Sequence, residues 1–417
     1  MKSVLVKRLG LTFSVLSSFR GNTRTCILVE PFWGIPFNLF APYASLYMLA
    51  LGCTKAQVGT ITAIGLIFQM FFALMGGYIT DRLGRKRTSL IFDLLSWSIP
   101  TLIWMVAQNY YYFLVAAILN AMVRIVQNSW NCLMIEDAPP EQRVHIYTWV
   151  EVANILAGFF APLSGYLVER FTLVPAVRGL YALAALSMTF MFFLRNKYTE
   201  ETTIGRKKIQ EARLHTPLTA FREYPVLMKD LFLNPFTRAA FLLVMLNNVQ
   251  IVLRNTFLGI VLNKGIGIPQ ETLGVFPAIG SAVVMFIYIF IMPAVGSRPP
   301  AKPLRFGLSF FLTGIVLLLL TPAGNLTWAL GAHFIASIGS AFVTPFVNGN
   351  IANRVMDEHR AKQMAIVYAV VYGGSAPFGW LAGSIAMIDA RYPLLISLLA
   401  GVASILLVPS ATRRESR

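Results

Sequence analysis

Long uncharged, apolar stretches alternate with short polar breaks along almost the whole chain. Ala56–Thr80 and Leu94–Val123 contain no Asp, Glu, Lys or Arg, and neither does Phe306–Asn353, which only the turn sequence TPAGN interrupts. Since about 20 apolar residues in a helix cross the hydrocarbon layer of a bilayer, each stretch is long enough for one crossing or two. The pattern predicts twelve membrane-spanning helices, at about residues 27–50, 57–80, 88–108, 111–134, 145–168, 176–194, 238–262, 271–294, 304–321, 326–351, 363–387 and 392–409.

The composition agrees with a membrane protein. The chain is 56% hydrophobic and 13% charged, whereas about a quarter of the residues in a soluble domain are charged. We therefore expect an all-α polytopic membrane protein, with its twelve transmembrane helices in two pseudo-symmetric six-helix bundles. The expected parts are a cytoplasmic amphipathic N-terminal segment (1–26), an N-terminal six-helix bundle (27–195), a cytoplasmic linker (196–236), a C-terminal six-helix bundle (237–410) and a cytoplasmic tail (411–417). Within the linker, TEETTIGRKKIQEAR is expected to be solvated and PLTAFREYPVLMKDLFLNPF to lie on the membrane surface.

The basic residues predict how the helices are oriented. The net charge is +17, and most of the 35 Lys and Arg residues fall on one side of the predicted spans. The loops on the other side hold only Lys55, Arg170, Arg178, Lys264 and Arg391. By the positive-inside rule both termini are cytoplasmic, and we expect a multi-pass protein of the cell membrane. Its positive charge would then face anionic lipid headgroups, and no nucleic-acid partner is expected.

The sequence contains no pattern that points to a cofactor or to enzymatic chemistry. Cys26, Cys53 and Cys132 lack paired spacing, so neither a disulfide framework nor a zinc site is indicated. A glycine-rich phosphate loop and a nucleophile triad are also absent from the sequence. We expect no metal, no cofactor and no enzymatic activity.

Two short patterns recur in the second half of the chain at the same offset. The spaced pair Gly52 and Gly59 recurs as Gly267 and Gly274, and the small-residue pattern Gly158, Ala161 and Pro162 recurs as Gly373, Ala376 and Pro377. Small residues at such spacing permit close helix packing, which is the role expected for the second pattern. The repeat indicates two related bundles, and transporters built this way bind substrate between their repeats and alternate access by rocking.

A dense cluster of charge follows the second predicted span. Gly77, Asp81, Arg82, Gly84, Arg85 and Lys86 fit the pattern G-x-x-x-D-R-x-G-R-[KR] at every fixed position. This stretch resembles the signature loop of the major facilitator superfamily, and the span count, the midpoint linker and the repeat extend the resemblance over the chain. The resemblance implies a gating latch. The alternative is a solvated cluster that only sets topology.

Further gating pairs are expected in the loop EDAPPEQR after the fourth span, from Glu136, Asp137 and Arg143. Within the spans, Arg124 resembles the arginine element that the superfamily carries in span four, which implies proton coupling. The pattern from Gly158 to Gly165 resembles the antiporter element of span five, which implies a drug:proton antiporter-like protein. For Arg124, an interhelical hydrogen-bond anchor is the alternative.

Carboxylates inside the membrane are costly and are therefore candidates for function. Glu151 in span five, Asp93 in span three and Glu30 in span one are candidate proton carriers, with a structural ion-pair network as the alternative. In span seven, Asn247, Gln250 and Arg254 share one helical face, with Asn38 of span one as a companion. A polar stripe on a membrane helix favours a substrate cavity, and interhelical bonding is the alternative.

The expected function is secondary active transport, with proton-coupled export of small amphipathic organic compounds by alternating access. The expected partners are the small-molecule substrate, protons as the coupling ion and the lipid bilayer, for a protein that acts as a monomer. A transporter of an anionic metabolite is the first alternative, because intramembrane arginines can clamp a carboxylate or phosphate. The second alternative is a non-transporting sensor or scaffold on a transporter fold.

Overall fold

The computed structural model describes residues 19–212, 228–229, 233–296, 299–352 and 360–412, and in those residues it contains helices and no strand. Eleven of the described helices are long and apolar enough to cross a membrane. They are continuous passages at Lys55–Leu83, Arg85–Met105, Tyr110–Ile135, His145–Phe171, Leu173–Tyr198, Pro235–Ile266, Gln270–Val295, Ala301–Leu319, Leu326–Ile351, Gln363–Ala386 and Pro393–Ala411.

A further passage precedes these eleven in the chain and brings the total to twelve. It is built from short helical pieces. It contains α2 (Gly21–Val29), α3 (Pro31–Phe40), η1 (Ala41–Tyr43) and α4 (Ala44–Ala50). Prolines at 31, 36 and 42 lie at or inside these pieces, and each lacks the N–H that a continuous helix needs. The chain therefore has the all-helical, roughly twelve-passage architecture that its hydropathy predicts.

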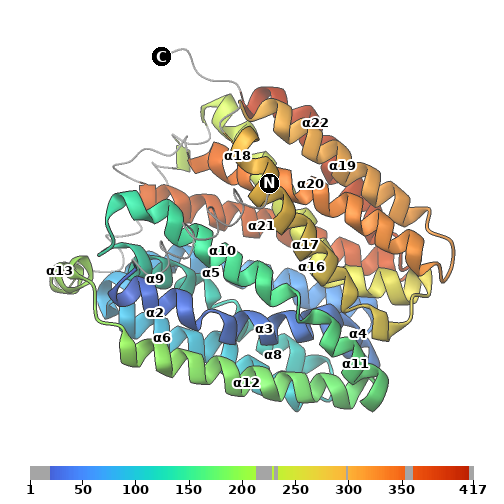
Figure 1. The fold of residues 1–417 in the computed structure, drawn as a ribbon, viewed down its shortest axis with the longest axis horizontal. Helices are drawn as coiled ribbons and strands as arrows, with labels where there is room; N and C mark the ends of the chain where they lie inside the picture. The colour runs from blue at the N-terminus through green and yellow to red at the C-terminus, as the bar shows by residue number, and fades with distance from the viewer. Residues whose placement is uncertain (1–18, 213–227, 230–232, 297–298, 353–359, 413–417) are drawn as a thin grey trace, which may run out of the picture.

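The helices form two bundles, which Figure 1 shows as a lower blue-to-green layer and an upper yellow-to-red layer. The first comprises α2 to α4 with α5 (Lys55–Leu83), α6 (Arg85–Asp93), η2 (Leu94–Ser98), α7 (Ile99–Met105), α8 (Tyr110–Asn120), α9 (Val123–Ile135), η3 (Pro140–Gln142), α10 (Arg143–Gly158), α11 (Ala161–Phe171) and α12 (Leu173–Tyr198). The second comprises α16 (Pro235–Ile260), η4 (Val261–Ile266), η5 (Gln270–Thr272), α17 (Val275–Phe286), η6 (Ile287–Ile291), α18 (Met292–Val295), α19 (Ala301–Leu319), α20 (Leu326–Ala352), α21 (Arg360–Ala386) and α22 (Pro393–Ala411).

The long axis of the molecule has two distinct ends. We call the end where α12 passes into α13 (Thr203–Ala212) the linker end, and the opposite end, where α4 turns into α5, the far end. At the far end, Gly52 and Gly267 have nearly the same backbone angle, with φ of +88° and +86°. The recurring glycines thus make equivalent tight turns before the second passage of each bundle, at an angle that favours glycine.

The two bundles meet along two helix pairs whose contacts are made by small residues. Between α5 and α21, a Cβ on Gly59 would lie 2.6 Å from the carbonyl oxygen of Gly379 and 2.7 Å from the Cα of Gly383. Between α11 and the start of α17, there is no room for a Cβ on Gly274 against the carbonyl of Ala161. These positions lie toward the far end, where backbone packs directly on backbone and closes the space between the bundles.

Other expected packing residues also lie between the bundles. Gly158 of α10 has no room for a Cβ against Ser281 of α17, and Gly373 of α21 packs on the Met70 side chain of α5. Ala161 and Ala376 are buried, whereas Pro162 and Pro377 are exposed on the outer surfaces of their helices. The recurring small residues therefore occupy corresponding places in the two bundles.

Candidate functional site

A cavity of about 1130 Å³ lies between the two bundles. Its polar and charged lining residues come from many helices: Glu30, Thr62, Gln69, Asp93, Asn120, Arg124, Gln127, Asn131, Thr148, Glu151, Asn154, Arg195, Asn248, Asn255, Thr256, Thr344 and Asn348. The lining extends to Tyr147 and Thr148, about one turn from the start of α10 at the linker end. Since glycine contacts close the far end, the cavity in this state opens toward the linker end.

One wall of the cavity is aromatic. Trp33 and Phe37 of α3 stack with ring centroids 4.9 Å apart, and Trp97 of η2 meets both rings edge-on, at 5.1 Å and 5.8 Å. Such rings offer large apolar faces that also attract cations. The indole nitrogen of Trp130, another lining residue, is buried and has no hydrogen-bond partner among the described residues.

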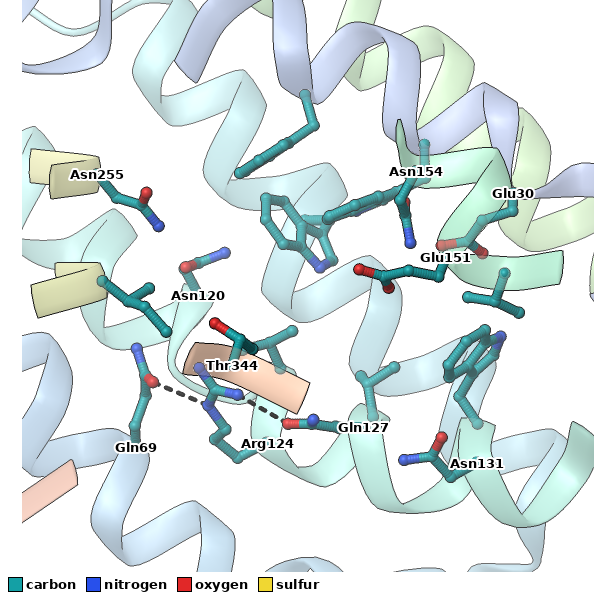
Figure 2. Close-up of a pocket in the computed structure, with 18 of the residues that line it drawn as sticks. Glu30, Gln69, Asn120, Arg124, Gln127, Asn131, Glu151, Asn154, Asn255 and Thr344 are labelled. Atoms are coloured by element: carbon teal, nitrogen blue, oxygen red, sulfur yellow. Dashed lines mark hydrogen bonds between the residues drawn. The ribbon is translucent and has the colours of Figure 1, made fainter. Parts of the chain in front are cut away.

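Arg124 lies in the middle of the cavity. It donates to Gln69 at 2.8 Å and to Gln127 at 2.7 Å (Figure 2). Its guanidinium also stands 4.2 Å from the ring centre of Tyr372 on α21, so that the arginine of one bundle contacts the other. None of the described ion pairs gives Arg124 a carboxylate partner.

The carboxylates of the cavity have different surroundings. Asp93 and Arg195 are both buried and form an ion pair. Glu30 lies near that pair and is buried, and no described ion pair includes it. Glu151, on α10, is accessible from the cavity and points into it (Figure 2). The described lining thus holds three carboxylates, Glu30, Asp93 and Glu151, against two guanidinium groups, Arg124 and Arg195.

The charge cluster at the linker end is an ordered network. Arg85 is 4% exposed and donates to Asp81 at 2.9 Å and to Glu136 at 3.0 Å. The carboxylate of Glu201 accepts from the backbone N–H groups of Arg85 and Lys86, each at 3.0 Å. Glu201 therefore caps the N-terminus of α6, where a negative charge is stabilised.

One expectation about this region differs from the structure. The chain after α12 is not a solvated linker throughout, because Glu201 and Thr202 pack on the ends of α6 and α9 through hydrogen bonds to Arg85 and Glu136. The described ion pairs of the charge cluster lie within the first bundle. A helix N-terminus supplies unpaired N–H groups that attract a nearby carboxylate, which explains why this acidic segment folds back.

The remaining gating candidates are more peripheral. Arg82 is exposed and donates to the hydroxyl of Tyr78 at 2.8 Å, and Asp137 accepts from the backbone N–H of Thr203 at 3.2 Å. Arg143 is exposed at the start of α10. Gly77 lies on α5, where the nearest contact of an added Cβ would be Asn128, at 4.0 Å.

The polar stripe of span seven is placed differently from expectation. Asn247 and Gln250 are buried and do not line the large cavity, and Gln250 and Arg254 instead line a second cavity of about 30 Å³ within the C-terminal bundle. The face that lines the large cavity carries Asn248 and Asn255. The two faces differ by one residue, which is about 100° of rotation around the helix, and hydropathy alone does not separate them.

The sequence pattern of a single helix does not show which of its residues line the cavity. Asn38 lies outside the lining and donates to the carbonyl of Gly34 at 2.8 Å. Gln69 and Asn120 were not expected in the site, and their single polar side chains in long apolar helices are the available signal. Arg195 lies near the end of α12. A basic residue at the end of a span is normally taken to set the orientation of the helix, not to line a cavity.

Comparison with solved structures gives matches over nearly the whole chain. A mutant of the peptide transporter POT in complex with sulfate has a TM-score of 0.68 at 13% identity, covering 95% of this chain and 96% of that one. The nucleoside transporter NupG has a TM-score of 0.69 at 13% identity, covering 94% and 98%. A POT family transporter in complex with 5-aminolevulinic acid has a TM-score of 0.67 at 13% identity, covering 93% and 94%. At this identity the likeness establishes the fold.

The sequence comparison points to the same fold. None of the curated proteins compared with the chain matches it. The profile of the Major Facilitator Superfamily, in contrast, matches residues 33–379, which is most of the chain and includes the charge cluster, α5, α11, α17 and most of α21. The chain belongs to the Major Facilitator Superfamily, and it is accordingly a multi-span membrane transporter and not an enzyme.

Proposed function

We propose that this protein is a proton-coupled transporter that exports small amphipathic organic compounds by alternating access. The observation that carries the proposal is the cavity between the bundles, which combines an aromatic wall with an excess of carboxylate. A cavity of about 1130 Å³ accommodates a drug-sized molecule, since ligand pockets have volumes of roughly 300–1,000 Å³.

The aromatic wall supports an amphipathic ligand. Trp33, Phe37 and Trp97 present apolar faces on one side of the cavity, and the carboxylate of Glu151 lies on another side. A ligand with a ring system and a cationic group would find a partner for each part. An aromatic surface also tolerates ligands of varied shape, because stacking does not require a fixed hydrogen-bond pattern.

Glu151 is the carboxylate that we assign to proton coupling, with Glu30 and Asp93 as further candidates. Glu151 is reachable from the cavity and lies on α10, which packs on α17 of the other bundle. A carboxylate that must give up water when the cavity closes favours its protonated form. Binding of a cationic ligand favours the ionised form, so ligand and proton would compete for Glu151. Arg124, without a carboxylate partner in the described ion pairs, would tune that exchange.

The linker-end network is proposed to act as the gate. Asp81, Arg85 and Glu136 tie α5, α6 and α9 together. Half-buried Lys86 lies at the same end, where the other bundle would close, as do three exposed residues, Arg82, Asp137 and Arg143. Gly84 provides the turn of the motif, and Gly77 faces Asn128 with room to spare. We also propose cytoplasmic termini, a cell-membrane location, a monomer, and the five-part division of the chain given above.

Transport of an anionic metabolite is the second candidate. It is favoured by Arg124, whose guanidinium lies in the cavity beside neutral Gln69 and Gln127 and could pair with a carboxylate or phosphate of the ligand. The excess of cavity carboxylates argues against it, because these groups repel an anion.

The test is proton movement in proteoliposomes of known orientation, with a pH dye in the lumen. Lipophilic cations and small organic anions would be added to wild type, Glu151→Gln and the matched control Glu169→Gln, whose side chain is exposed on α11 outside the cavity lining. We expect cation-driven proton counterflow that is lost in Glu151→Gln and kept in Glu169→Gln. A response to anions alone, lost in Arg124→Gln, would reassign the protein to metabolite transport. Wild type that moves protons with neither class would refute the proposal.

A further inference from the structure

The second, smaller cavity lies within the C-terminal bundle and has a volume of about 30 Å³. It is lined by residues of α16, η4, α19, α20 and α22, all from the second bundle. A single water needs about 10–15 Å³ of such volume. The space therefore holds one monatomic ion or about two waters, and it is too small for an organic substrate.

The polar lining of this cavity is rich in hydrogen-bond donors. The side chains are Gln250 and Arg254 from α16, His333 and Ser337 from α20, and Ser397 from α22. The lining contains no Asp or Glu. A site made of a guanidinium, an amide and hydroxyl groups, with no carboxylate, has the chemistry of an anion site.

Gln250 provides an independent sign that a ligand is required. Its side chain is 5% exposed, and its amide nitrogen has no hydrogen-bond partner among the described residues. Leaving a buried N–H donor unsatisfied is unfavourable, so a structure that retains one usually places a bound group beside it. Since the amide is a donor, the missing partner is an acceptor.

Arg254 provides the charge. One of its nitrogens donates to the hydroxyl of Ser340 at 2.9 Å, and none of the described ion pairs includes this arginine. Its side chain is exposed, but it lies well inside the passage formed by α16, where a positive charge without an ionic partner is costly. Water that reaches the exposed part of the side chain can satisfy its hydrogen bonds, whereas an anion also neutralises its charge.

We propose that the cavity lined by Gln250, Arg254, His333, Ser337 and Ser397 binds a small inorganic monovalent anion, of which chloride is the common example. The ion would accept hydrogen bonds from the amide of Gln250, the guanidinium of Arg254 and the hydroxyl of Ser337. It would join α16 to α20 and α22, and so stabilise the packing of the C-terminal bundle. The proposal does not depend on which substrate the central cavity carries.

Thermal unfolding of the full-length protein in detergent tests the proposal. Potassium chloride would replace potassium gluconate at constant ionic strength, because gluconate is too large for the cavity. We expect a saturable rise in the unfolding midpoint with chloride or bromide. In Arg254→Gln and Gln250→Leu, the half-saturating concentration should rise about tenfold or more, as expected from losing a charge-assisted hydrogen bond. The control Arg305→Gln removes an exposed arginine and should titrate like wild type.

Two outcomes would overturn the proposal. One is a wild-type midpoint that responds equally to chloride and gluconate, which would mean that the cavity holds water alone. The other is a chloride response that survives unchanged in both cavity variants. If the variants do not fold, bromide-soaked crystals of wild type decide the matter: an anomalous peak between Gln250 and Arg254 supports the site, and its absence refutes it.

Discussion

Arg85 illustrates how a single residue organises the charge at the linker end. Its side chain is 4% exposed, and its planar guanidinium reaches Asp81 and Glu136 at the same time. Burying a charge is costly unless it is paired, so removal of one partner costs more than the pair itself contributes. The motif is therefore a packed ion-pair network, and its two arginines are not equivalent.

Replacing Arg85 with Gln should destabilise the protein by about 3–5 kcal/mol, the usual cost of leaving a buried ion-pair partner alone. Arg82 is exposed, and its described side-chain hydrogen bond goes to the hydroxyl of Tyr78. Arg82→Gln should therefore change stability by less than about 1 kcal/mol. Denaturant unfolding in detergent would compare the two variants. Equal losses would contradict the network described above.

Gly84 is the second residue whose role follows from its own geometry. Its backbone angles are φ +86° and ψ 161°, and a Cβ would lie 2.5 Å from the carboxylate oxygen of Glu201. Gly84→Ala should therefore destabilise by about 1–3 kcal/mol, since side-chain-bearing residues rarely adopt these angles. Gly179→Ala is the control, because it is helical with open space around it, and it should be neutral or slightly stabilising. The unfolding midpoints would distinguish them.

The helix pairs α5–α21 and α11–α17 act as elements that set the distance between the bundles. At the far end, glycine lets two backbones touch, so even one methyl group has no place. Such contact is short-ranged, and it is lost as soon as the helices separate by an ångström or two. The pairs therefore suit an interface that must open and close.

Gly383→Ala should separate α5 from α21 at the far end and favour states that are open there. Its added Cβ would lie 2.7 Å from the Cα of Gly59, whereas the control Gly331→Ala on α20 meets nothing within 4 Å. In a background without native cysteines, Thr62→Cys would report the opening through its reaction with a membrane-impermeant maleimide from the far side. We expect roughly a tenfold faster reaction in Gly383→Ala, on the scale of a shift of 1.4 kcal/mol. An unchanged rate would show that the contact does not hold the far end closed.

At the scale of the whole molecule, the described conformation has a sealed far end and a cavity that reaches the linker end. Access from one side at a time is the essential requirement of alternating access. The closed far end and the open cavity are consequences of the same arrangement of two rigid bundles. When the bundles tilt together at one end, they separate at the other.

This arrangement predicts sided labelling of the cavity. Asn131→Cys, which replaces a lining residue of α9, should react at least about tenfold faster with an impermeant maleimide from the linker side than from the far side. Ala323→Cys, exposed in the far-end turn between α19 and α20, should show the opposite preference. Oriented vesicles labelled from either side would give both rates. Equal labelling of Asn131→Cys from the two sides would contradict a sealed far end.

The passages and their order could be predicted from the sequence because hydropathy is a local property. Eleven of the twelve expected passages appear as long apolar helices in the structure. The first passage is divided into short helices because it contains several prolines. The glycines at 52 and 267 were found from the repeat alone and prove to make equivalent turns. In contrast, no local signal showed that Glu201 caps α6, because its partner lies more than a hundred positions earlier in the chain.

The amino-acid sequence by itself therefore determined the class of protein, the number of passages and the family motif, since each depends on composition or on spacing within one segment. Only the tertiary structure decided which face of each helix meets the cavity. Asn247 and Asn248 are neighbours in sequence, yet the first is buried outside the cavity lining and the second lines it. The reason is physical: one residue turns a helix by about 100°, and the rotation of a helix is set by what packs on its other faces.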